Sequence, residues 1–156
     1  MRIHLVFVGK TAFGDIESAI DRYVKRLLHY CRVEIHYVRG EKIGGGIGDQ
    51  LVRDREGERI LKLTGRGEHL IILDQRGREL DSTGLSKLLE GLGDSAVSEV
   101  WMIVGGPVGV ADKLLENARE VLSLSKMTFP HDLARLMLVE QLYRAFTIIK
   151  GEPYNR

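Results

Sequence analysis

The stretch VWMIVGGPVG at 100–109 decides the fold, because five apolar residues run directly into a loop of glycine and proline. A short run without alternation is typical of a strand buried on both faces of a parallel sheet. LIILD at 70–74 repeats this pattern and ends in an acid. Open α/β sheets bind ligands where such strands end, and glycine lets the backbone approach a small molecule. The two runs therefore predict an α/β fold with a ligand site at the strand ends.

Strand and helix patterns alternate along the rest of the chain. Apolar and other residues alternate at 1–8 and 33–37, which predicts two further strands, whereas 16–28 follows the helical period. The remaining expected segments are a glycine-rich loop at 41–49, a turn at 75–80, an extended or irregular stretch at 123–129, and helices at 49–63, 82–92, 111–122 and 132–149. Without a repeat or linker, residues 1–156 are expected to form one domain, a mainly parallel sheet flanked by helices.

Composition narrows the functional classes. The apolar runs are too short to span a bilayer, and the start MRIHLVFVGK lacks a small-residue cleavage site, so a cytoplasmic protein is expected. The net charge of +1 provides no basic field of the kind that marks many nucleic-acid binders. A small basic patch, or one pooled by two subunits, would still bind RNA.

Cysteine and histidine usage disfavours a metal centre. Cys31 is the only cysteine, which excludes an internal disulfide and a thiolate cluster. The five histidines do not fall at HxxxH or HExxH spacing. We therefore expect no dedicated metal site, although this reasoning leaves open ligands that come from distant segments.

The last helix is apolar around nearly its whole circumference, with a narrow polar stripe at Glu140, Arg144 and Thr147. Such a helix must be covered on more than one side. The pattern predicts a dimer interface, with a central core helix as the alternative.

Two loops are candidates for ligand contact. GGGIG at 44–48 matches neither the P-loop nor the dinucleotide pattern, and a flexible surface loop is the better interpretation. GGPVG at 105–109 suits main-chain contacts to an adenosine-like group, but a structural turn explains it equally well. These residues alone leave both interpretations open.

The C-terminal segment carries the candidates for chemistry. Residues 123–131 form either a ligand-wrapping loop or a strand and turn. His131 lies beside a helix N-terminus, whose dipole disfavours the imidazolium form, so it is a candidate neutral base, a substrate donor or a capping residue. Tyr154 and Arg156 suit base stacking and phosphate contact, although a chain end usually frays.

These segments, taken together, resemble the RlmH (YbeA-like) family, SPOUT-class methyltransferases that modify a pseudouridine in 23S ribosomal RNA. The resemblance covers essentially the whole chain. The matching segments are MRIHLVFVGK at 1–10, DREGERIL at 54–61, LDQRG at 73–77, IVGGPVG at 103–109, LSLSKMTFPH at 122–131 and LVEQLYRAFTIIKGEPY at 138–154.

The resemblance implies a SPOUT-type fold with a C-terminal trefoil knot, an exception to the rule that chains avoid knots. It also implies S-adenosylmethionine bound in the knot and a homodimer in which each site combines one subunit's cofactor with the other's tail. The family's cofactor contacts carry over onto Leu73, Gly105, Leu124, Ser125, Lys126, Met127, Thr128 and Phe129.

The implied reaction is methylation of N3 of a pseudouridine, in the large subunit or the assembled ribosome. His131 is the candidate base or orienting residue, Tyr154 would position the target base, and Arg156 would stabilise charge or phosphate. Asn155 stands where the family usually has histidine, and asparagine forms hydrogen bonds but does not titrate. The alternatives are a ribosome-binding factor with weak or lost catalysis and a methyltransferase for another RNA.

Overall fold

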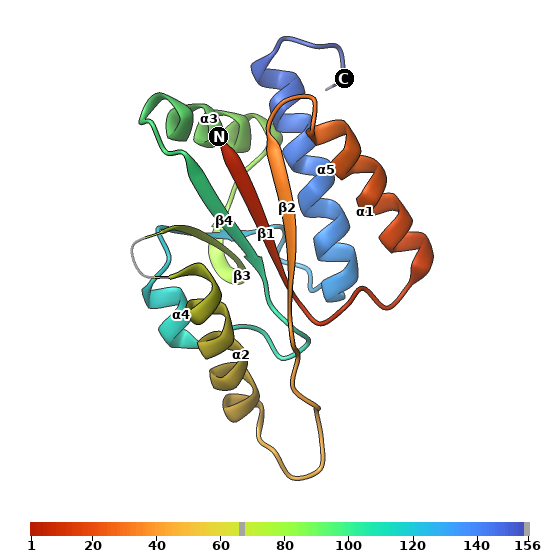
Figure 1. Ribbon diagram of the computed structural model, residues 1–156, viewed down its shortest axis with the longest axis vertical. Coiled ribbons are helices and arrows are strands. Elements are labelled where there is room, and N and C mark those ends of the chain that lie inside the picture. Colours follow the sequence, from red (N-terminus) through yellow and green to blue (C-terminus); the bar gives the residue numbers. More distant parts are fainter. Residues whose placement is uncertain (66–67, 155–156) are drawn as a thin grey trace.

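Five parallel strands form one sheet in the order β2-β1-β4-β3-β5 in the computed structural model, which describes residues 1–65 and 68–154 (Figure 1). The strands are β1 (Arg2–Val8), β2 (Arg32–Val38), β3 (His69–Glu79), β4 (Glu99–Val104) and β5 (Glu120–Ser123). The helices are α1 (Gly14–Leu27), α2 (Asp49–Thr64), α3 (Ser82–Asp94), α4 (Asp112–Glu116) and α5 (His131–Ile149). The α/β class with a parallel sheet is confirmed.

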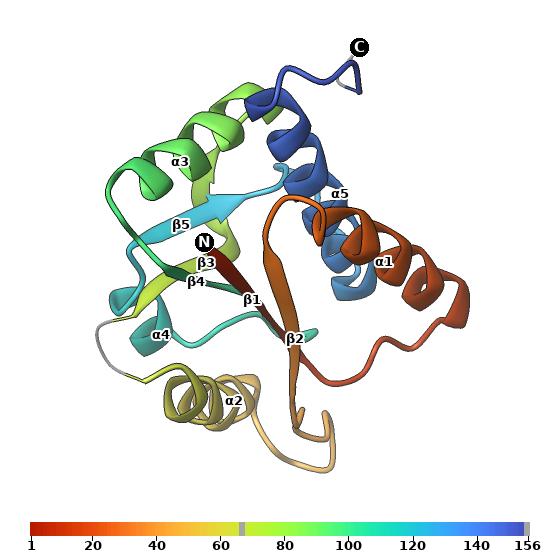
Figure 2. The ribbon, with the colours of Figure 1, turned by 45° about the horizontal axis from the view of Figure 1, so that its top comes forward.

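Helices cover both faces of the sheet, which is why its central strands are apolar throughout (Figure 2). On β1, the side chains of Ile3, Leu5 and Phe7 pack with α1, α3 and α5. Val6 and Val8 point to the other face and pack with α2 and α4. The two hydrophobic clusters therefore stabilise the sheet from opposite sides.

The final helix α5 packs against α1, α3 and β4, so three elements cover it within one chain. Leu138, Val139, Leu142 and Ala145 are buried in the same cluster as the sheet. This packing accounts for most of its apolar circumference, as the core-helix alternative expected. The dimer interface stays a prediction. No helix in residues 1–65 and 68–154 has the length and apolar content to cross a membrane.

Two sequence predictions were wrong. The helix predicted at 111–122 is only the five-residue α4, and the chain continues into β5, whose four residues are too few to show a period. The turn predicted at 75–80 belongs to β3, which has a bulge between Leu73 and Arg78. A Cβ on Gly77 would lie 2.6 Å from the Leu122 backbone, so pairing with β5 determines this conformation.

Candidate functional site

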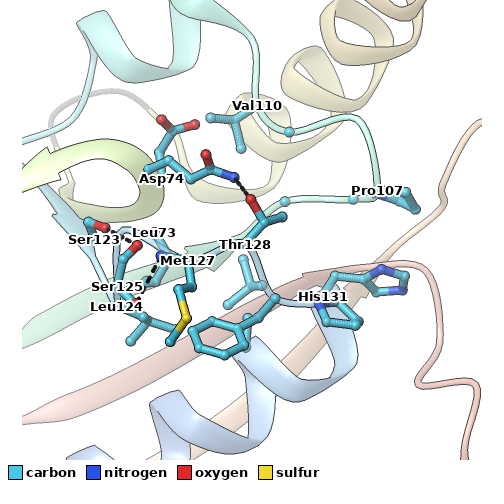
Figure 3. A pocket seen from close by; sticks show the side chains of 18 residues that line it. Leu73, Asp74, Pro107, Val110, Ser123, Leu124, Ser125, Met127, Thr128 and His131 are labelled. Atoms are coloured by element: carbon cyan, nitrogen blue, oxygen red, sulfur yellow. Dashed lines mark hydrogen bonds between the residues drawn. The ribbon is translucent and has the colours of Figure 1, made fainter.

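A pocket of about 560 Å³ opens beside the bulge of β3 and the carboxyl ends of β4 and β5 (Figure 3). This volume falls within the range of roughly 300–1,000 Å³ that is typical of small-molecule sites. Its walls are residues 73–75, 104–107, 109–110, 123–125 and 127–131, with Ala134. The pocket lies where the parallel sheet predicts a ligand site.

The loop after β4 forms one wall through its backbone. The Gly109 N–H donates to the Gly106 carbonyl at 3.0 Å, and Gly109 adopts a φ of 84° that favours glycine. A Cβ on Gly105 would lie 2.6 Å from Val110 Cγ1, closer than any relaxed contact between carbons. Close packing therefore requires glycine here and leaves the main chain facing the pocket.

Glu56 of α2 lies beneath this loop, nearly inaccessible to solvent at 3% exposure. One carboxyl oxygen accepts the Glu41 N–H at 2.9 Å. The other has no partner within the described residues and would lie 3.0 Å from a Cβ on Gly106. Burial raises the pKa of Glu56, and the Glu41 hydrogen bond opposes this shift only in part. Glu56 was not among the predicted site residues, although Val52 and Ile60, four residues away on either side, mark its buried helix face.

The segment after β5 forms the opposite wall. The Ser123 hydroxyl donates to the Ser125 carbonyl at 2.9 Å, and the Ser125 hydroxyl accepts the Met127 N–H at 3.0 Å. The Gln75 amide donates to the Thr128 hydroxyl at 3.1 Å, which joins this wall to the β3 bulge. These contacts hold the segment in place along the pocket.

The structure brings together seven of the eight predicted cofactor residues. Those that line the pocket are Leu73, Gly105, Leu124, Ser125, Met127, Thr128 and Phe129. Lys126 is exposed and lines a separate depression with Glu79, Leu80 and Asp81. The glycine-rich loop at 44–48 does not line the pocket, in agreement with its interpretation as a surface loop.

His131 lies at the pocket edge, in the first turn of α5 (Figure 3). Burial lowers its pKa, Arg135 lowers it further, and Asp132, whose Oδ1 is 3.4 Å from His131 Nε2, opposes the shift. The imidazole is therefore neutral at pH 7 and available to accept a proton.

Buried polar groups fix this first turn of α5 to the end of β1. Asp132 accepts the Ala12 N–H at 2.8 Å. Arg135, fully buried, donates to the Thr11 hydroxyl at 3.1 Å and the Val8 carbonyl at 2.5 Å. The orientation of α5 at the pocket therefore depends on the buried Asp132–Arg135 ion pair and on the hydrogen bonds that each of the two side chains makes.

Asp74, in the bulge of β3 beside the pocket, forms an ion pair with Arg76. Burial would raise its pKa, but three hydrogen bonds from Arg76 outweigh that effect and hold the pKa below its ordinary value. Asp74 is thus an ionised acceptor that orients Arg76, which also donates to Asp112 at 2.7 Å.

Tyr154 lies at the far end of α5, away from His131. Its hydroxyl donates to Glu140 at 3.2 Å, and the Arg144 guanidinium stands 4.8 Å from its ring centroid. At 1.5 Å per residue, Glu140 and the Tyr154 hydroxyl beside it lie about 14 Å along α5 from His131. One chain therefore does not unite these two predicted catalytic residues. Arg156 and Asn155 lie outside the described residues.

A family model described as "Predicted SPOUT methyltransferase" matches residues 1–155. The chain belongs to this family. Curated relatives are similar along their whole length. "Ribosomal RNA large subunit methyltransferase H" of Syntrophobacter fumaroxidans is 54% identical over 100% of both chains, and the protein of the same name from Acetivibrio thermocellus is 43% identical over 100% of both.

Solved structures support the family's fold. A probable methylase family protein from Haemophilus influenzae superposes with a TM-score of 0.58 at 12% identity, over 99% of this chain and 70% of that one. A probable methyltransferase from Bordetella pertussis gives 0.57 at 12% identity, over 93% and 96%. At this identity the likeness concerns the fold alone.

Proposed function

We propose that this chain transfers a methyl group from S-adenosylmethionine to N3 of a pseudouridine in 23S ribosomal RNA, within the large subunit or the assembled ribosome. The observation that carries this proposal is the pocket between the Gly105–Gly109 loop and the 123–131 segment, in a chain 54% identical to a named ribosomal RNA large subunit methyltransferase. Its action would take place in the cytoplasm, with its ribosomal substrate.

The pocket residues fit the cofactor. The loop after β4 offers backbone where a Cβ at Gly105 would clash with Val110, so main-chain groups would bind the adenosine. Residues 124, 125 and 127–129 would enclose the rest from the opposite wall. When bound, the cofactor supplies a methyl group already activated on a sulfonium. The protein therefore has mainly to align the nucleophile and exclude water.

His131 is the group that would accept the N3 proton. N3 carries an imino proton that must leave as the methyl group arrives, which calls for a base or a stabiliser of the developing anion. The lowered pKa of His131 keeps its imidazole neutral at pH 7, and Asp132 Oδ1 lies 3.4 Å from its Nε2. The target base must also be extruded from its stack to reach this edge.

The complete site would need two subunits. Within one chain, the Tyr154 hydroxyl lies beside Glu140, about 14 Å along α5 from His131. A homodimer that packs α5 against its copy would bring Tyr154 and Arg156 of the partner subunit to the pocket. Leu133, Met137 and Ile148 support such packing, because they lie on α5 outside the hydrophobic core cluster. There Tyr154 would stack on the target base and Arg156 would contact phosphate.

The same family membership supports a trefoil knot, in which the chain after β5 would thread through the loop that precedes it. We propose it for residues 123–154, whose first part faces the Gly105–Gly109 loop across the pocket. A crystal structure whose traced chain passes beside that loop without threading it would refute the knot and leave the pocket intact.

The proposed activity is tested with methyl-labelled cofactor and four substrates: assembled ribosomes, large subunits, free 23S RNA and free nucleotides. We expect label in 23S RNA from ribosomal particles. Label only in free nucleotides or in another RNA would refute the proposed substrate. Ribosome association without label would instead support the binding-factor alternative.

A further inference from the structure

Three metal-ligand side chains meet toward the amino end of the sheet, outside the pocket: His4 on β1, and Glu34 and His36 on β2. His4 Nδ1 is 3.0 Å from His36 Nε2. Glu34 Oε2 is 3.8 Å from the first nitrogen and 3.9 Å from the second. A point equidistant from the corners of this triangle is about 2.1 Å from each atom, which matches zinc–nitrogen and zinc–carboxylate distances.

The backbone explains why distant residues meet here. His4 and Glu34 are register partners on neighbouring parallel strands, and Glu34 and His36 are two residues apart on one strand and so share its face. The helical motifs sought in the sequence do not describe such a site. The expectation that the chain has no dedicated metal site therefore rested on spacings that apply to helices.

Packing fixes the buried ligand. The ring of His4, 4% exposed, stacks on Trp101 with centroids 4.0 Å apart and planes 12° apart. Its other nitrogen, Nε2, has no hydrogen bond within the described residues and lies 3.8 Å from Glu99 Oε2. Metal-binding histidines usually direct this second N–H to a carboxylate, so Glu99 stands where such a partner is expected.

Charge and protonation also suit a cation. The two histidine nitrogens that contact each other are the same two that would bind the ion. A bound metal would take the place of the one proton that lies between them. Burial lowers the pKa of His4 and so favours the neutral form that binds metals. Arg2 is the nearest cation, but it pairs with the Oε1 atoms of Glu34 and Glu99 and leaves both Oε2 atoms facing the histidines.

We propose that His4, Glu34 and His36 bind one divalent transition-metal ion of the zinc type, with water completing the coordination. Two imidazoles and a carboxylate form a donor set that suits zinc. His4 is three residues before Phe7 on β1, which pairs with the pocket residue Val104, so the site lies about 10 Å from the pocket edge.

The experiment uses full-length, tag-free protein stripped with a chelator. Calorimetric titration with Zn²⁺ should give one equivalent per chain. Titration with Co²⁺ should give the visible absorption bands of a nitrogen and oxygen site and quench Trp101, the only tryptophan. Neither readout depends on methyl transfer, so this proposal and the proposed function can fail separately.

Two accessible ligands provide the variants, because His36 and Glu34 lie nearer the surface than His4. Loss of an outer-shell partner costs roughly 10- to 100-fold in affinity, so removal of a ligand by His36→Gln or Glu34→Gln should cost at least about 100-fold. His29→Gln, at an exposed histidine elsewhere, should leave Zn²⁺ affinity unchanged.

Three results would overturn the proposal. The first is no stoichiometric Zn²⁺ binding by the wild-type protein, and the second is unchanged affinity in His36→Gln. The third is binding that persists in both ligand variants but is lost in Cys31→Ser, which would place the ion elsewhere. Circular dichroism of each variant confirms that it is folded before affinities are compared.

Discussion

Substitution of Gly105 by alanine tests the pocket wall most severely. The added Cβ would lie 2.6 Å from Val110 Cγ1 and 3.2 Å from the Gly109 carbonyl oxygen. Carbon atoms pack best at about 3.5–4.0 Å, so the loop or Val110 must move by roughly 1 Å. Val110 is 4% exposed and branched at Cβ, so it has little freedom to rotate away. The strain therefore falls on the loop that lines the pocket.

Overpacking of this kind costs about 1–3 kcal/mol. We expect Gly105→Ala to lower the free energy of unfolding by that amount. Affinity for S-adenosylmethionine should fall by about tenfold or more, since a tenfold loss corresponds to about 1.4 kcal/mol. Gly91→Ala is the matched control, because Gly91 is an exposed position of α3 with open space around its Cβ position. There the same change should stabilise the protein by about 0.5–1 kcal/mol.

Urea denaturation gives the free energy of unfolding of both variants, and calorimetric titration gives the cofactor affinity. Opposite signs for the two alanines would support the packing argument. If Gly105→Ala matched the wild type in both stability and cofactor affinity, the loop would not be close-packed as described, and the reasoning would be refuted. If stability fell while affinity was unchanged, the loop would be close-packed but not part of the cofactor site.

Four further predictions concern the buried groups and the divided site. Arg135→Ala should cost about 3–5 kcal/mol in urea denaturation because it leaves Asp132 buried and unpaired, and equal stability would contradict this. The pKa of Glu56 is raised in the folded protein, so the wild type should lose stability relative to Glu56→Gln as pH rises above about 4.5. This loss should level off once pH exceeds the pKa of Glu56 in the folded protein. Free energies of unfolding that change in parallel with pH in the two proteins would argue against burial of the charge. His131→Gln should slow methyl transfer by about 10²–10⁴-fold. In the wild type the rate should rise with pH through a pKa below 6.5, and this rise should be absent in the variant. Co-expressed His131→Ala and Tyr154→Ala chains should recover about a quarter of wild-type activity through mixed dimers, whereas independent monomers would recover none.

The sequence was sufficient for the elements whose side chains show a period or a continuous apolar run. β1, β4 and α5 begin and end within two residues of their predicted bounds. β5 was missed because four residues at a sheet edge take their conformation from pairing with β3. The second half of β3 was predicted as a turn because glycine at position 77 is typical of turns. In the structure, glycine is needed at this position because a side chain would clash with the Leu122 backbone.

The pocket was predictable in place but not in all its parts. Glycine and proline after apolar strands indicated its walls, and the family resemblance supplied residues 124–129, all but Lys126 in the pocket. Glu56 was not predicted as a site residue, because Val52 and Ile60 indicate a buried helix face but do not show which loop covers it. The histidine and glutamate cluster was missed for a related reason, since strand register alone brings His4 to Glu34.

Mass spectrometry of 23S RNA tests the central claim most directly. RNA would be compared from cells with the protein, from cells without it, and from deleted cells that carry His131→Gln. We expect one N3-methylated pseudouridine in the first sample and an unmethylated pseudouridine at the same position in the second. In the third sample, little of the methylation should be restored. An identical methylation pattern with and without the protein would contradict the account.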